Sequence, residues 1–244
     1  MEQPYKQKIA LFIDADNAPA KKFEDVLNEV AKYGVVSIRK AYGNWKKESI
    51  KPWEEHLHEY AIQPVQQYDL VKGKNASDIA LVIDAMDVLY TKDIDVMCFV
   101  SSDCDFTPMV TRALAEGKVV LGFGERKTPA PFVNACSKFL FLDDENQNGE
   151  ETLSSSVKKQ NKNIKSNTKL INLIRRAIQA TEDENGWALL GPVGSHISNK
   201  VSFDTRNYGY KNLSSLINAI DLFELKRGPG NSYMVRDIRK KKSN

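Results

Sequence analysis

The sequence predicts an α/β protein, in which a parallel, doubly wound sheet with helices on both faces precedes a small winged-helix domain. Two observations predict the sheet and the domain that follows it. Over residues 1–142, apolar runs of strand length, such as residues 9–13, alternate with segments of helical periodicity. The end of the chain instead has three short amphipathic segments and two short strands around a turn, which is the pattern of a winged helix.

Composition sets the broad class of the protein. The 244 residues are 41% hydrophobic and 27% charged, with a mean hydropathy of −0.45, as in soluble globular proteins. No apolar run approaches the ~20 residues that cross a bilayer. The first residues lack the order of a signal peptide, so we expect a cytoplasmic protein without a membrane partner. The three cysteines show no CxxC spacing, which argues against a disulfide framework or a zinc site.

Charge is distributed unevenly along the chain. Residues 1–150 carry 18 Lys and Arg against 24 Asp and Glu, whereas residues 151–244 carry 17 basic and 8 acidic residues. Such asymmetry suggests two domains with different roles. The basic half is a candidate for binding nucleic acid, although basic surfaces that only contact solvent are common.

The first domain is predicted to occupy residues 1–142. Its strands are expected at residues 9–13, 35–41, 61–67, 95–100, 118–123 and 139–142. Its longer helices are expected at residues 21–33, 52–60, 107–116 and in a segment that Asp78 opens with Ser77 as N-cap. Gly34 and Gly117 are predicted to end the helices before them, and Asp84 and Asp87 to lie on a solvated helix face.

Residues 143–167 have few apolar side chains and no period, and we predict a flexible linker there. The second domain is expected at residues 168–236, before a basic tail at 237–244. Its helices are predicted near residues 170–178, 189–197 and 213–220, and its hairpin strands at 223–225 and 233–235. The sequence Gly-Pro-Gly-Asn at 228–231 predicts the turn between those strands.

Carboxylates follow the predicted first and fourth strands. Asp14 and Asp16 come directly after the first strand, Asp103 and Asp105 follow the fourth, and Asp78 starts a helix between them. In a doubly wound sheet these two strands can be neighbours, with their carboxyl ends at one crevice. Oxygen ligands without Cys or His favour a hard cation such as Mg²⁺ or Mn²⁺. The alternative is that these carboxylates cap helices or lie in solvated loops.

Three motifs together carry a family resemblance. IDADN at residues 13–17, KNASDIAL at 74–81 and SSDCDFTPMV at 101–110 resemble the NYN domain over roughly residues 6–142. The resemblance implies a PIN-like, Rossmannoid fold related to FLAP nucleases, in the branch that includes LabA-like proteins. It also implies Mg²⁺- or Mn²⁺-dependent cleavage of RNA.

The resemblance also assigns residues. The acidic metal site of the family falls on Asp14, Asp78, Asp103 and Asp105. Asn17 matches the amide of the first motif, and Ser101 matches the small hydroxyl residue before the last acidic pair. These six residues are therefore expected at a catalytic site. Asp16 stands at a variable position of the motif and ranks second.

The second domain resembles an OST-HTH/LOTUS domain. GWALLGPVGSHI at 186–197, YGYKNLSSLINAIDLFEL at 208–225 and the closing SYMVR carry this resemblance. It implies an RNA or protein partner. Basic and aromatic residues suited to RNA are Lys72 and Lys74 in the first domain and Arg206, Tyr208 and Lys211 in the second. The alternative is a polar surface loop for the two lysines of the first domain, and a basic surface with aromatic residues in the core for the second domain.

The leading hypothesis is a metal-dependent RNA endonuclease, a hydrolase with a C-terminal RNA-targeting domain. The alternative is a non-catalytic RNA-binding regulatory adaptor in which the acidic site is vestigial. A third hypothesis, a haloacid-dehalogenase-like phosphatase, rests on the pair Asp14 and Asp16. It is disfavoured because a helix follows Asn17 without the insertion that such enzymes carry. The sequence leaves the oligomeric state open, and a homodimer is possible.

Overall fold

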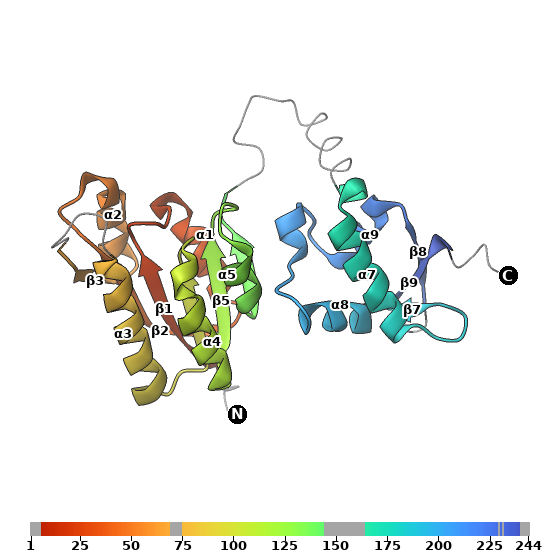
Figure 1. The fold of residues 1–244 in the computed structure, drawn as a ribbon, viewed down its shortest axis with the longest axis horizontal. Coiled ribbons are helices and arrows are strands. Elements are labelled where there is room, and N and C mark those ends of the chain that lie inside the picture. The colour runs from red at the N-terminus through yellow and green to blue at the C-terminus, as the bar shows by residue number, and fades with distance from the viewer. Residues whose placement is uncertain (1–5, 69–74, 144–163, 229, 231, 240–244) are drawn as a thin grey trace, which may run out of the picture. The chain divides into compact units, whose positions relative to one another are not determined.

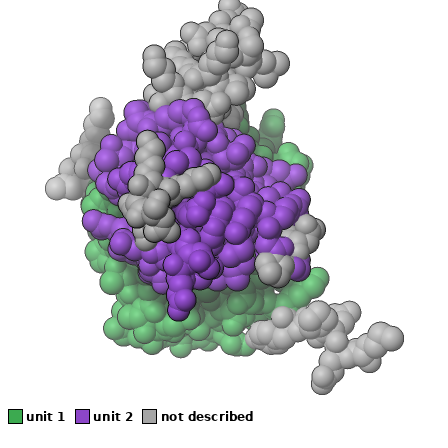
Figure 2. Space-filling view, turned by 90° about the vertical axis from the view of Figure 1, so that its right-hand side faces the viewer, with its two compact units in different colours: residues 1–144 green, residues 145–244 purple. Residues whose placement is uncertain are grey.

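The computed structural model describes residues 6–68, 75–143, 164–228, 230 and 232–239. The chain divides into two compact units, residues 1–144 and 145–244 (Figure 2). Most of the predicted linker, residues 144–163, lies outside the described residues. Within the described part of the chain, every helix is too short or too polar to cross a membrane.

The first unit is built on one parallel sheet of six strands (Figure 1). Its strand order is β3-β2-β1-β4-β5-β6, so the predicted α/β fold is confirmed. The strands are β1 (Gln7–Asp14), β2 (Gly34–Gly43), β3 (Gln63–Gln66), β4 (Val96–Val100), β5 (Val119–Gly124) and β6 (Lys138–Phe141). Strands β1 and β4 are direct neighbours in the sheet, although β2, β3 and the first three α-helices lie between them in the chain. The strand order therefore reverses at this pair, which makes it a topological switch point.

Alternate side chains of β1 enter two different cores. Ile9, Leu11 and Ile13 pack with the helices α1 (Phe23–Val30) and α2 (Pro52–Glu59) on one face of the sheet. Ala10 and Phe12 pack on the other face with the helices α3 (Ala76–Thr91), α4 (Thr107–Ala115) and α5 (Ala130–Ala135). Each large apolar side chain buried in this way stabilises the fold by about 1.5–3 kcal/mol. A strand buried on both faces needs a continuous apolar run, which explains the sequence of β1.

The role predicted for Gly34 was wrong. Helix α1, which follows the 3-10 turn η1 (Ala20–Lys22), ends at Val30, and Gly34 is the first residue of β2. A Cβ atom at Gly34 would lie 2.0 Å from the carbonyl oxygen of Gln7. Glycine is therefore required here because two neighbouring strands approach closely, and the residue does not end a helix.

Two predictions for α3 also need correction. The helix begins at Ala76, two residues earlier than predicted, and its N-cap is Asn75 instead of Ser77. Asp84 does not lie on a solvated face. Its Oδ2 accepts hydrogen bonds from the Tyr42 hydroxyl at 2.6 Å and from Lys40 Nζ at 2.7 Å, both on β2. Asp84 therefore joins α3 to the sheet.

The second unit packs three helices and a small antiparallel sheet around one core. Its elements are α7 (Thr168–Thr181), β7 (Ala188–Leu189), α8 (Leu190–Ser198), η4 (Thr205–Tyr208), α9 (Leu213–Ile220), β8 (Phe223–Arg227) and β9 (Tyr233–Asp237). The sheet order is β7-β9-β8, so the predicted hairpin is present and a third strand joins it. Strand β7 has two residues, too few to produce a periodic signal in the sequence.

Candidate active site

Asp14 and Ser101 leave the sheet side by side. The register of β1 and β4 pairs Ile13 with Val100, so the next residue of each strand lies at the same edge. The Ser101 hydroxyl donates a hydrogen bond of 2.7 Å to Oδ2 of Asp14. Asn17 Nδ2 donates a second bond of 3.0 Å to the same oxygen. Three of the predicted site residues are thus brought together.

The other oxygen of Asp14 is buried and has no partner among the described residues. The residue is 1% exposed, and its Oδ1 accepts no hydrogen bond from any described residue. Burial raises the pKa of Asp14 to about 6, although the hydrogen bonds from Ser101 and Asn17 act in the opposite direction. A buried carboxylate oxygen without a hydrogen bond is costly, so this atom favours a proton or a bound cation.

The loop after β4 is folded so that it presents two carboxylates. Ser101 Oγ accepts a hydrogen bond of 3.0 Å from the backbone N–H of Asp103. Oδ1 of Asp103 in turn accepts a bond of 2.9 Å from the backbone N–H of Asp105 and caps the 3-10 helix η3 (Cys104–Phe106). Ligand atoms of Asp103, Cys104 and Asp105 lie within 4.8 Å of one another, closer than any other such group among the described residues.

Asp78 lies in the first turn of α3, as predicted. Partial burial, followed by the negative charges of Asp103, Asp16 and Asp105, raises the pKa of Asp78 to about 6. The positive charge of Lys47 acts in the opposite direction. Asp78 also contributes to the raised pKa of Asp14. The four predicted acidic residues therefore form one electrostatically coupled cluster, which we call the acidic cluster: Asp14, Asp78, Asp103 and Asp105.

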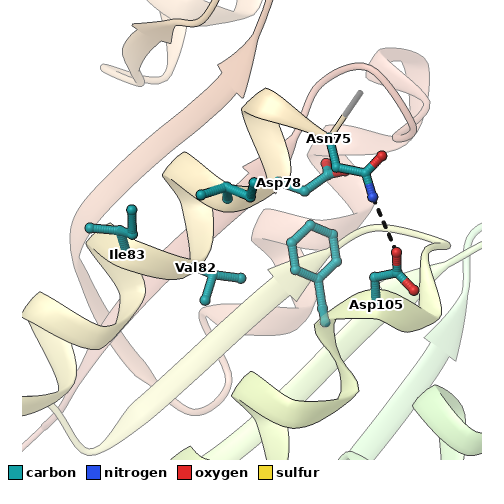
Figure 3. A pocket seen from close by; sticks show the side chains of 7 residues that line it. Asn75, Asp78, Val82, Ile83 and Asp105 are labelled. Atoms are coloured by element: carbon teal, nitrogen blue, oxygen red, sulfur yellow. Dashed lines mark hydrogen bonds between the residues drawn. The ribbon is translucent and has the colours of Figure 1, made fainter. Parts of the chain in front are cut away.

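Asp16 has partners of its own. Lys47 Nζ lies 3.2 Å from its Oδ1, and the Ser77 hydroxyl donates a hydrogen bond of 3.3 Å to its Oδ2. Asn75 Nδ2 similarly donates a bond of 3.2 Å to Oδ2 of Asp105 (Figure 3). Lys47, Ser77 and Asn75 are neighbours of the site that were not predicted from the sequence. The KNASD motif contains two of them, but nothing local marks Lys47.

The predicted RNA contacts are distributed over the chain. Lys72 and Lys74 lie outside the described residues.

In the second unit, Arg206 Nε and Nη2 donate bonds of 2.9 and 2.8 Å to the carboxylate of Asp204. The Tyr208 ring lies 5.8 Å from that of Phe203, and Lys211 is exposed before α9. Arg206 and Tyr208 therefore have structural contacts in addition to any role in binding RNA.

Two domain-family models match this chain, one in each unit. The NYN domain model matches residues 8–143, and the OST-HTH/LOTUS domain model matches residues 162–235. The uncharacterized protein MJ0482 of Methanocaldococcus jannaschii is 26% identical over 167 residues, which cover 66% of this chain and 65% of that protein. A Vibrio parahaemolyticus protein of unknown function, VPA0982, has a solved structure with a TM-score of 0.49 and 21% identity, covering 59% of this chain and 98% of that one.

Both matched domain families are associated with RNA. NYN domains are generally ribonucleases, and OST-HTH/LOTUS domains are associated with RNA binding. The NYN match spans more than half of the chain and contains the whole acidic cluster. The chain therefore belongs to the NYN domain family and carries an OST-HTH/LOTUS domain after it.

Proposed function

We propose that this protein is a metal-dependent RNA endonuclease whose active site is the acidic cluster. The observation that carries the proposal is the buried Oδ1 of Asp14, which accepts no hydrogen bond from the described residues. The nearby negative charges of Asp78 and Asp16, which help to raise the pKa of Asp14, suit a cation at this oxygen better than an apolar contact. Asn17 and Ser101 orient Asp14 by holding its other oxygen.

The side chains of the acidic cluster fit a hard divalent cation. All four offer carboxylate oxygens, which are the ligands that Mg²⁺ and Mn²⁺ prefer. Asp14, Asp78, Asp103 and Asp105 would hold the cation, whereas the thiol of Cys104 is a soft ligand and is not needed. When bound, such a cation supplies charge stabilisation at the phosphodiester and lowers the pKa of a coordinated water.

The residues of the chain have separate tasks in this proposal. Ser101 and Asn17 fix the orientation of Asp14 before RNA arrives, which limits the reorganisation needed during reaction. The raised pKa of Asp78 reflects negative charge gathered around it, which a bound cation would offset. Lys47 pairs with Asp16 beside the acidic cluster, and its positive charge offsets part of the negative charge of the cluster.

The second unit is proposed to bind the RNA strand. Lys211 and the exposed part of Arg206 offer positive charge to phosphates, and Tyr208 lies between them in sequence. The hairpin provides a further basic and aromatic group, because Lys226 Nζ lies 3.8 Å from the centre of the Trp187 ring and the Arg227 guanidinium lies 4.4 Å from that of Tyr233. Lys72 and Lys74 remain predicted contacts in the first unit.

Cleavage of RNA by the purified full chain tests the proposal. Single-stranded and structured RNAs are incubated with Mn²⁺, with Mg²⁺ or with EDTA. We expect internal cleavage with either metal, none in EDTA, and a loss of at least about 100-fold in Asp103→Asn, since one missing charge stabiliser commonly costs this much. The matched control is Asp25→Asn, which removes an exposed carboxylate from α1.

Two outcomes would contradict the proposal. Equal cleavage by the wild type and by Asp103→Asn would show that the activity does not come from the acidic cluster. RNA binding without metal-dependent cleavage would instead support the adaptor hypothesis. A preparation in which Asp25→Asn loses activity as strongly as Asp103→Asn would indicate a general effect of charge.

A further inference from the structure

An apolar slot adjoins the acidic cluster. It is a cavity of about 300 Å³ between α3 and η3, and we call it the α3 slot (Figure 3). Its lining residues are Asn75, Asp78, Ile79, Val82, Ile83, Asp105 and Phe106. Two of these, Asp78 and Asp105, also belong to the acidic cluster. Whatever occupies the slot therefore lies directly beside the proposed position of the scissile phosphate.

The walls of the α3 slot are aliphatic and accessible. Ile79 and Ile83 stand one helical turn apart on α3 and are 60% and 58% exposed, whereas Phe106 is fully buried behind them. Large apolar side chains exposed together beside a polar site typically mark a ligand-binding surface. These side chains can contact the flat face of a ring, but they offer no hydrogen bonds that would distinguish one ring from another.

The end of the slot nearest the acidic cluster is polar. Asp78 and Asp105 contribute carboxylates there, and the Asn75 amide is held by its hydrogen bond to Asp105. The slot thus has apolar sides and a polar end, which suits a flat group with an apolar face and a polar edge. Its volume is at the lower limit of ordinary ligand sites, so it suits one ring system better than a folded segment.

We propose that the α3 slot holds an unpaired nucleobase of the RNA strand whose phosphodiester lies at the acidic cluster. This inference rests on the proposed function and adds a subsite for one base to it. A base within a duplex is paired and stacked on both faces, so it must leave the helix before it can enter a slot. Aliphatic walls contact the face of any base, so any preference among bases must come from the polar end of the slot.

The test measures binding of the base separately from cleavage. Short single-stranded RNAs carry 2-aminopurine at one position each, and its fluorescence is recorded as the full chain binds. All chains carry Asp103→Asn, because this substitution is expected to keep the RNA intact in the presence of Mn²⁺. Asp103 does not line the slot. The test variant adds Ile79→Gln and Ile83→Gln, both at exposed positions. The control adds Tyr90→Gln, which removes a 51% exposed ring from the same helix outside the slot.

We expect one 2-aminopurine position to change its fluorescence on binding. The double glutamine variant should lose that change and bind the RNA about tenfold more weakly, because apolar contact with one base is lost. Tyr90→Gln should retain both the fluorescence change and the affinity. A duplex with the same 2-aminopurine position should show no change.

Three results would overturn the slot proposal. The first is an equal fluorescence change and equal affinity with and without the glutamines. The second is the same response from the duplex. The third is a mass measurement in which the glutamines convert a dimer to a monomer while the fluorescence response persists, since a second copy would then occupy the slot. Failure of the wild type to cleave RNA contradicts the ribonuclease alone, whereas cleavage without a slot-dependent response contradicts the slot alone.

Discussion

The Ser101 hydroxyl lies 2.7 Å from Oδ2 of Asp14, a residue 87 positions earlier in the chain. The same hydroxyl oxygen accepts the backbone N–H of Asp103. One small side chain therefore connects the end of β1 to the loop that presents Asp103 and Asp105. The geometry of the acidic cluster depends on this connection.

Replacing Ser101 by alanine should weaken both the fold and the cluster. The Asp103 N–H loses its acceptor and Asp14 loses a donor, so we expect the free energy of unfolding to fall by about 1–3 kcal/mol. The pKa of Asp14 should rise further, because the hydrogen bond from Ser101 lowers it. Urea unfolding measures the first effect and Mn²⁺ calorimetry measures the weaker binding. Ser37→Ala is the control, since its hydroxyl donates a 3.3 Å bond to Ile9 away from the cluster. Unchanged metal affinity in Ser101→Ala would contradict this role.

Asp14 should make the metal-free protein more stable at lower pH. Its pKa is about 6 in the folded chain against an ordinary value of 3.8, so the folded state binds more protons between these values. The free energy of unfolding should therefore increase as the pH falls from 7 to 4, by roughly 3 kcal/mol from this group. Urea unfolding in EDTA, compared between the wild type and Asp14→Asn, isolates that contribution. Parallel pH profiles for the two proteins would refute it.

Lys47→Gln should raise the pKa of Asp78. Lys47 carries the nearby positive charge that lowers this pKa, and its ion pair with Asp16 is 3.2 Å long. The cost in stability should stay below about 1 kcal/mol, since the Lys47 side chain is partly exposed. Carboxyl carbon NMR in EDTA measures the titration. Lys51→Gln, which removes an exposed pair with Glu48, should leave it unchanged. A Lys47→Gln titration that matches the wild type would show that Lys47 does not act on Asp78.

Gly124→Ala should disturb the acidic cluster by displacing the backbone at Ser101. A Cβ atom at this end of β5 would lie 2.5 Å from the carbonyl oxygen of Ser101, so the backbone must shift. We expect a loss of about 1–3 kcal/mol in stability together with weaker Mn²⁺ binding. Gly191→Ala in α8 meets no atom within 4 Å among the described residues and should instead stabilise by about 0.5–1 kcal/mol. Thermal unfolding and Mn²⁺ calorimetry of both variants provide the comparison.

The sequence predicted those parts of the fold that depend on local pattern. The apolar run of β1 identifies a strand buried on both faces, and its polar end identifies the edge where the cluster forms. The neighbouring position of β1 and β4 followed from the topology of doubly wound sheets and is confirmed. The site residues themselves remain proposals, although the structure places Asp14, Asn17 and Ser101 in direct contact.

Contacts between distant segments could not be predicted in this way. Asp84 has the spacing of a solvated residue on α3, yet it accepts hydrogen bonds from Lys40 and Tyr42 on β2. Nothing near Lys47 in the sequence indicates that it pairs with Asp16, 31 positions away. Gly34 looked like a helix end because glycine is common there, whereas the reason for glycine is the close approach of Gln7.

The pairing of β1 with β4 also determines when the cluster can form during synthesis. Asp14 is made early, but Ser101 and Asp103 reach it only after β4 has been made and has joined the sheet beside β1. A shorter nascent chain contains the first carboxylate without its partners. The acidic cluster can therefore be complete only after synthesis has passed Asp105 and β4 has paired with β1.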